Sequence, residues 1–314
     1  MLSSETIELQ LNSEYHFKIY NEYFCGILQS VECIGEVLPF LNCSPIRWHL
    51  YRTDYRFAIV PSEPGTGGPA VEFRDVCFYY PGAEEPALKS ISFTARAGET
   101  TAVIGGTGSG KTTLINLILR FYDATEGQLL VYGQDVQNQP VEALRDRIGY
   151  VPQAAVLFTG TIADNIRYGK QDATDDEVKF AAGIAQASEF VEKNEDQYEM
   201  TIAQAGANVS GGQKQRLSIA RALVKKPEIY IFDDSFSALD FKTDAALRKE
   251  LEKETQNSTV LIVAQRLGTI MNANQIIVLE DGKISGIGTH KELLKSNEVY
   301  REIALSQLSE EELA

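Results

Sequence analysis

The chain has 314 residues, of which 44% are hydrophobic and 23% are charged, a composition typical of a globular protein that buries a core. Its formal net charge of −15 argues against a broad nucleic-acid-binding face and gives no attraction to anionic lipid, so we expect no nucleic-acid partner. No run approaches the roughly 18 apolar residues that span a bilayer, and the start lacks the basic-then-apolar order of a secretory signal.

Residues 1–69 differ in composition from the rest of the chain. They hold the only tryptophan, Trp48, and three of the four cysteines, Cys25, Cys33 and Cys43. No helical or strand period is evident there, and Gly and Pro predict a linker over Pro61–Pro69. Cysteine spacings that fit no zinc pattern predict free thiols in a reducing cytoplasm. We predict that residues 1–69 form an N-terminal extension. Three interpretations of this extension stay open: a packing appendage, a poorly ordered leader, or the remnant of a membrane domain.

Two strands are predicted after the linker, followed by a strand, a glycine-rich loop and a helix. Residues 71–78 alternate apolar and polar side chains, as a half-buried strand does, and residues 88–95 form a second such run. A short buried strand over 101–104 then enters the glycines, and an apolar helix is predicted over 112–120. This is the context in which a phosphate-binding loop occurs.

The glycine loop at residues 105–112 matches the pattern GxxxxGK[ST]. Its glycines allow backbone N–H groups to surround phosphates, and the helix that follows directs its positive N-terminus at them. We expect Lys111 to contact the β- and γ-phosphates, and the Thr112 hydroxyl to bind Mg²⁺. The predicted phosphate-binding residues are Gly105, Gly106, Thr107, Gly108, Ser109, Gly110, Lys111, Thr112 and Thr113.

Two later apolar runs, over 228–232 and 259–263, have the length and composition of strands in a parallel sheet covered on both faces. Residues 275–279 and 283–287, joined at Asp281-Gly282, predict a hairpin. Strands that alternate with helices after a β-rich start indicate an α/β fold, here a single domain over residues 70–314.

The segment NVSGGQKQRLSIARAL, residues 208–223, resembles the signature of ATP-binding-cassette (ABC) ATPases. Together with the phosphate loop, the resemblance covers about residues 71–308. It implies a P-loop NTPase (RecA-like) core with an antiparallel β-subdomain and a helical signature subdomain. It also implies ATP and Mg²⁺ as ligands and a dimer in which the signature contacts the γ-phosphate of ATP on the other subunit. The signature residues are Ser210, Gly211, Gly212 and Gln213.

The resemblance assigns further roles position by position. Tyr80 is similar to the aromatic residue that stacks on adenine, although its neighbour Tyr79 is a rival for this role. Gln153 resembles the glutamine that contacts Mg²⁺ and the attacking water. Asp233 resembles the carboxylate that holds Mg²⁺ through water. Residues 237–240 resemble the D-loop, which packs between the two nucleotide sites.

Two segments look most like the exporter branch of the family: VLFTGTIADNI after Gln153 and the tail EVYREIALSQL. The resemblance implies a membrane-domain partner, contacted by the helical layer between Gln153 and the signature. The chain itself is then peripheral, at the cytoplasmic face of the cell membrane. Gln204 stands where exporters usually have an acidic residue that helps this coupling.

The nucleotide site departs from the family pattern at two catalytic positions. Asp234 replaces the glutamate that polarises the attacking water, and a misplacement near 1 Å costs on the order of a hundredfold in rate. Gln265 replaces a histidine, and glutamine can donate a hydrogen bond to phosphate but carries no positive charge. Together the two residues are typical of the slow subunit of a heterodimeric exporter, although a homodimer stays open.

Two other interpretations are kept. A soluble ABC protein without a membrane partner would act as a regulatory or interaction module. A non-functional fragment would carry residues 1–69 where a membrane domain belongs. The sequence does not indicate which substrate is transported.

Overall fold

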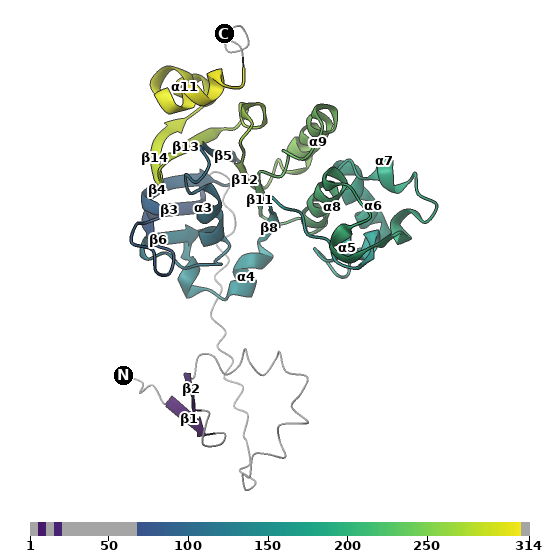
Figure 1. Cartoon of the computed structure of the whole chain (residues 1–314), viewed down its shortest axis with the longest axis horizontal. Helices are drawn as coiled ribbons and strands as arrows, with labels where there is room; N and C mark the ends of the chain where they lie inside the picture. Colours follow the sequence, from purple (N-terminus) through teal and green to yellow (C-terminus); the bar gives the residue numbers. More distant parts are fainter. Residues whose placement is uncertain (1–5, 11–15, 21–67, 309–314) are drawn as a thin grey trace. The chain divides into compact units, whose positions relative to one another are not determined.

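The computed structural model describes residues 6–10, 16–20 and 68–308 (Figure 1). The chain divides into two units, residues 1–59 and 60–314. In the first unit, β1 (Thr6–Gln10) pairs antiparallel with β2 (His16–Tyr20). The predictions for Cys25, Cys33, Cys43 and residues 61–67 lie outside the described residues.

A four-stranded antiparallel sheet has the order β4-β3-β6-β7. It consists of β3 (Pro69–Phe78), β4 (Leu88–Arg96), β6 (Glu126–Val131) and β7 (Gln134–Asp135). The predicted strands at 71–78 and 88–95 are therefore confirmed, and β3 begins at the last proline of the predicted linker. Buried side chains alternate along β4, and Phe73 stacks on Phe93 with ring centroids 4.7 Å apart.

A six-stranded sheet has the order β14-β13-β5-β12-β11-β8. Its strands are β5 (Thr100–Gly105), β8 (Ile148–Val151), β11 (Ile229–Asp233), β12 (Thr259–Val263), β13 (Gln275–Glu280) and β14 (Lys283–Gly288). Only β14 runs antiparallel to its neighbour. Every residue of β11 is buried, as expected for a parallel strand covered on both faces. The predicted hairpin is confirmed, since Asp281 and Gly282 have φ of 47° and 77°, which suit a tight two-residue turn.

One apolar core joins the two sheets through α3 (Lys111–Ile118). A second core joins the other side of β11 to α5 (Ile162–Arg167), α6 (Asp175–Ile184), α7 (Ser188–Val191) and α8 (Gly211–Val224). Figure 1 shows these four helices grouped together, away from the antiparallel sheet. A third core lies under α10 (His290–Ser296) and α11 (Glu298–Leu305). These layers confirm the predicted α/β class with its β-subdomain and helical subdomain.

The remaining elements are α4 (Val141–Asp146), α9 (Phe241–Glu254), the short strands β9 (Gly160–Thr161) and β10 (Thr201–Ile202), and the 3₁₀ turns η3 (Val136–Asn138), η4 (Gln197–Glu199), η5 (Gln204–Gly206) and η6 (Leu267–Thr269). Within the ranges that the structure describes, no helix has the length and apolar character needed to cross a membrane.

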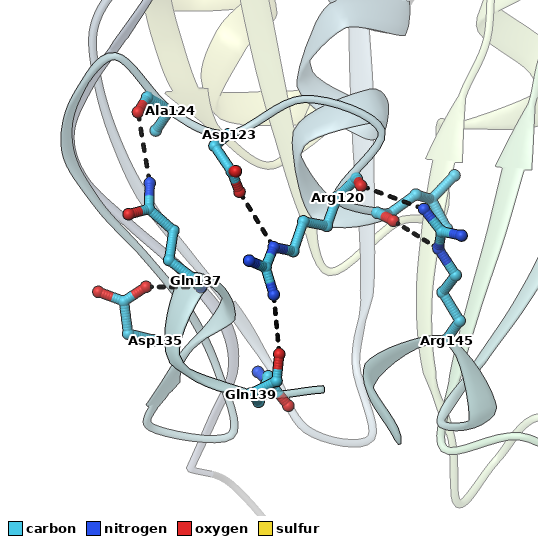
Figure 2. A network of polar contacts seen from close by, with 8 residues as sticks. Arg120, Asp123, Ala124, Asp135, Gln137, Gln139 and Arg145 are labelled. Atoms are coloured by element: carbon cyan, nitrogen blue, oxygen red, sulfur yellow. Dashed lines mark hydrogen bonds and ion pairs between the residues drawn. The ribbon is translucent and has the colours of Figure 1, made fainter. Parts of the chain in front are cut away.

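Helix α3 ends two residues before its predicted end, because Arg120 adopts a left-handed backbone conformation with φ of 52°. The two carbonyl groups that follow the helix accept from Arg145, which donates from Nε to the Leu119 oxygen at 3.0 Å and from Nη2 to the Arg120 oxygen at 3.1 Å (Figure 2). The Arg120 side chain in turn donates to Asp123 and to the Gln139 carbonyl. These contacts fix the far end of the helix that follows the glycine loop.

Candidate functional site

The glycine loop connects β5 to α3 and leaves one side open. A Cβ at Gly106 or at Gly108 would meet no atom within 4 Å. At Gly110, by contrast, φ is 102° and a Cβ would lie 2.7 Å from Leu88 Cδ2, so only glycine fits there. The loop is supported from behind, since Gly282 in the β13–β14 turn donates to the Ser109 carbonyl at 3.2 Å.

Lys111, at the start of α3, is held inside the loop. Its Nζ donates to the carbonyl oxygens of Gly105 at 2.8 Å and Gly106 at 2.7 Å, and to Ser109 Oγ at 3.3 Å. Burial lowers the pKa of Lys111, whereas the nearby carboxylates of Asp234 and Asp233 raise it. The partly desolvated ammonium group of Lys111 therefore lies at the open side of the loop.

Two adjacent carboxylates lie at the end of β11, Asp233 as its last residue and Asp234 directly after it. Asp233 is only 2% exposed, and its pKa is raised by burial and then by the like charge of Asp234. A hydrogen bond with Thr112 and the charge of Lys111 act in the opposite direction on the pKa of Asp233. Asp234 is also buried, and its backbone N–H donates to the Val263 carbonyl at 2.8 Å. The structure thus brings together Lys111, Thr112 and both carboxylates.

Gln153 and Gln265 follow β8 and β12, the two strands that flank β11, at the same edge of the parallel sheet. Gln153 Nε2 donates to Asp234 Oδ2 at 3.4 Å, which links two of the three predicted catalytic residues directly. Gln265 is exposed and comes two residues after Val263, the residue paired with Asp233 in the sheet register. Its predicted role at the γ-phosphate depends on this placement.

Tyr80 contacts the helix of the phosphate loop. Its hydroxyl lies 3.0 Å from Thr113 Oγ1, and its ring meets Phe78 and Tyr122 edge to face at 4.9 and 5.3 Å. Tyr79 instead uses its backbone N–H to contact Thr125. Tyr80 therefore lies beside the helix of the phosphate loop, and the choice between Tyr80 and Tyr79 as the partner of the base stays a prediction.

The signature lies at the N-terminus of α8, where Ser210 and Gln213 form hydrogen bonds with each other. Ser210 Oγ accepts from the Gln213 N–H at 3.3 Å, and the Gln213 side chain accepts from the Ser210 N–H at 2.8 Å. This reciprocal capping box leaves Ser210 and Gly211 exposed to solvent. A Cβ at Gly212 would lie 3.2 Å from the Ala238 carbonyl, so the signature touches the predicted D-loop.

Sequence reasoning missed two residues that hold this site in place. Arg266 Nη2 donates to the Ser237 carbonyl of the D-loop at 2.9 Å. Gln307, after α11, contacts the backbone on both sides of Arg266. Arg266 could have been suspected from its position next to Gln265, whereas no local pattern points to Gln307.

Comparison with known proteins places these features in one family. Residues 88–237 match the family model described as "ABC transporter". The chain also superposes on the structure of a bacterial Atm1-family ABC exporter with ATP bound, with a TM-score of 0.74 and 37% sequence identity. That match covers 78% of this chain and 43% of the other. The chain contains an ABC transporter nucleotide-binding domain.

Curated relatives of this ABC domain include transporters of exporter type. An uncharacterized ABC transporter ATP-binding protein of Mycobacterium bovis is 47% identical over 250 residues, which are 79% of this chain and 42% of the relative. A probable multidrug resistance ABC transporter ATP-binding/permease protein of Bacillus subtilis is 44% identical over 289 residues, 90% of this chain and 49% of the relative. The chain therefore spans less than half the length of these relatives.

Proposed function

We propose that this chain is the ATP-binding and ATP-hydrolysing subunit of an ABC exporter, and that its own composite site turns over slowly. The observation that carries the proposal is the convergence of Lys111, Thr112, Asp233 and Asp234 at the open side of the glycine loop. No other arrangement in the described ranges joins a phosphate-binding loop to a buried carboxylate pair. The family, in which such loops bind ATP, supports the same conclusion.

The residues of this chain supply most of the binding chemistry. The loop N–H groups and the N-terminus of α3 surround the phosphates, and the Lys111 ammonium offsets their negative charge. When phosphate oxygens arrive, the three loop oxygens that accept from Lys111 are exchanged for them. The Tyr80 ring, fixed by Thr113, provides a flat face for the base.

The chain also offers oxygen ligands that suit Mg²⁺. Thr112 contributes a hydroxyl, Asp233 a carboxylate and Gln153 an amide oxygen, and Mg²⁺ prefers oxygen donors shared with substrate phosphates. The residues present therefore fit this cation, since Thr112 and Asp233 already contact each other. Bound Mg²⁺ would neutralise charge on the phosphates.

We assign the slow turnover to Asp234 and Gln265. The Asp234 carboxylate accepts from Gln153 and can also accept a proton from water, but it is one methylene shorter than a glutamate. Gln265 can donate a hydrogen bond to a phosphate oxygen without contributing charge. Both differences weaken stabilisation of the transition state rather than binding of ATP.

A second ABC subunit completes the site, with each signature facing the nucleotide of the other chain. The solvent-exposed N-terminus of α8 supports this arrangement, since its N–H groups are suited to a phosphate that this chain does not itself hold. Phe241, beside the D-loop, is 82% exposed, as expected for a residue that a partner covers. We propose a heterodimer in which the other subunit performs most of the hydrolysis.

The helical layer after Gln153 is proposed to contact the membrane domain. Phe158 and Tyr168 stack with ring centroids 4.4 Å apart, and both remain exposed on this layer. A relative described as an ATP-binding/permease protein supports a permease partner. The chain would then work at the cytoplasmic face of a membrane.

The test is the steady-state ATPase activity of the purified chain and of the double variant Asp234→Glu/Gln265→His, each at a concentration at which two copies pair and their signatures complete the composite sites. The double variant restores the longer carboxylate and a side chain that can carry charge, so we expect turnover to rise at least about tenfold. Lys111→Ala in the same background is the control for contaminating ATPase and is expected to abolish the gain. Equal turnover of the chain and the double variant would contradict the assignment of a slow site to these two positions.

A further inference from the structure

The backbone around Gln265 is bridged by one side chain from the C-terminal end of the described chain. Gln307 Nε2 donates to the Gln265 carbonyl at 2.7 Å, and Gln307 Oε1 accepts from the Leu267 N–H at 2.8 Å. The amide nitrogen and the amide oxygen of Gln307 thus each bind a backbone group, and the two backbone groups belong to residues on either side of Arg266. Such a pairing fixes both the position and the direction of the intervening backbone.

The bridge is anchored to a rigid support. Leu267 and Ile270 are buried in one apolar core with Tyr300 and Ala304 of α11. Tyr300 is further held by a 2.7 Å contact between its hydroxyl and His290 Nδ1. Gln307 therefore projects from a well-packed pair of helices and not from a free tail.

The opposite side of the same segment is tied to the D-loop. Arg266 Nη2 donates to the Ser237 carbonyl at 2.9 Å, and Ser237 Oγ donates to the Asp234 carbonyl at 2.8 Å. Residues 265–267 are thus connected to the C-terminal helices on one side and to the carboxylate pair on the other.

We infer that Gln307 is a positioning residue that sets the place of Gln265 relative to the γ-phosphate. The inference rests on the proposed function, because it assumes that Gln265 contacts the γ-phosphate. Gln307 lies beyond α11 and acts on nucleotide only through the backbone of Gln265. The C-terminal helices thereby help the site to distinguish ATP from ADP.

The experiment combines amide hydrogen exchange at Leu267 with the ratio of ADP to ATP dissociation constants, both on the full chain with Mg²⁺. In Gln307→Ala, exchange of the Leu267 amide should speed up about threefold to tenfold in the absence of nucleotide, the range expected for one hydrogen bond. The preference for ATP over ADP should fall by a similar factor, while ADP affinity stays within about twofold.

Gln307→Glu separates the two halves of the bridge. A carboxylate still accepts from the Leu267 N–H but cannot donate to the Gln265 carbonyl. This variant should keep the slow exchange of Leu267 and still lose the preference for ATP. Ser306→Ala is the matched control, since Ser306 bonds only within its own helix end, to the Ile303 carbonyl, and it should change neither quantity.

Gln265→Ala distinguishes the inference from the proposed function. If it reduces the preference for ATP while Gln307→Ala does not, the positioning role of Gln307 is overturned. Unchanged Leu267 exchange in Gln307→Ala overturns the bridge itself. If Gln265→Ala leaves the preference unchanged, the γ-phosphate role proposed for Gln265 fails, and the Leu267 exchange rate still decides whether the bridge exists.

Discussion

Asp233 has an unfavourable electrostatic setting in the candidate site. It is nearly fully buried and adjoins a second carboxylate, and both conditions raise its pKa. Between the ordinary pKa and this raised value, the folded chain binds more protons than the unfolded chain. Stability is therefore lost as pH rises through that window, and is largest below it.

Asp233→Asn removes the buried negative charge while retaining an oxygen that accepts from Thr112. We expect the melting temperature of the nucleotide-free chain to rise by roughly 1–4 °C at pH 7.5, with a smaller rise at pH 4.5. Thermal unfolding at the two pH values measures the difference. Asp172→Asn, at an exposed aspartate, is the control. An equal gain at both pH values would show that charge on Asp233 is not the cause.

At the scale of single residues, the sequence predicted which side chains gather but not how they are held. Lys111, Thr112 and Asp233 are found together because they lie at the carboxyl ends of β5 and β11, two parallel strands separated only by β12. The φ of 46° at Asp234 and the bridge made by Gln307 could not be predicted. Both depend on contacts with residues distant in sequence, as Gln307 lies 42 positions from Gln265.

Helix α8 shows how one element combines stability with a proposed site. Ser210 is both the N-cap of α8 and the signature serine, and its hydroxyl accepts from the Gln213 N–H. The run of polar and glycine residues predicted the motif, whereas the capping box is visible only in the structure. Helix α6 carries the same type of capping box at Thr174 and Glu177, away from the signature.

Ser210→Ala and Thr174→Ala should therefore have equal effects on stability and unequal effects on function. Loss of either cap is expected to lower the free energy of unfolding by about 0.5–2 kcal/mol. Denaturant unfolding measures this for both variants. Only Ser210→Ala should also reduce ATPase activity when the chain is paired with its partner subunit. A matching loss of activity in Thr174→Ala would mean that stability alone explains the effect.

At the scale of the whole molecule, the α/β class was predictable, because apolar runs and turn residues mark the strands directly. The β-subdomain and the helical subdomain were expected only from the family resemblance. The division at residue 69 remains a prediction, as do the partner subunit and the membrane domain. The alignment with the Bacillus subtilis relative covers more of the chain than residues 70–314 provide, so it extends into the first 69 residues.

The central claim is that the phosphate loop and the signature of this chain serve two different nucleotides. Equilibrium binding of Mg²⁺-ATP to the chain alone, compared between Lys111→Ala and Ser210→Arg, tests it most directly. Lys111→Ala removes a charge-assisted contact with phosphate and should weaken binding at least about tenfold. Ser210→Arg should bind ATP within about twofold of the unmodified chain, because its signature completes another subunit's site. A loss of binding in Ser210→Arg as large as that in Lys111→Ala would contradict the claim.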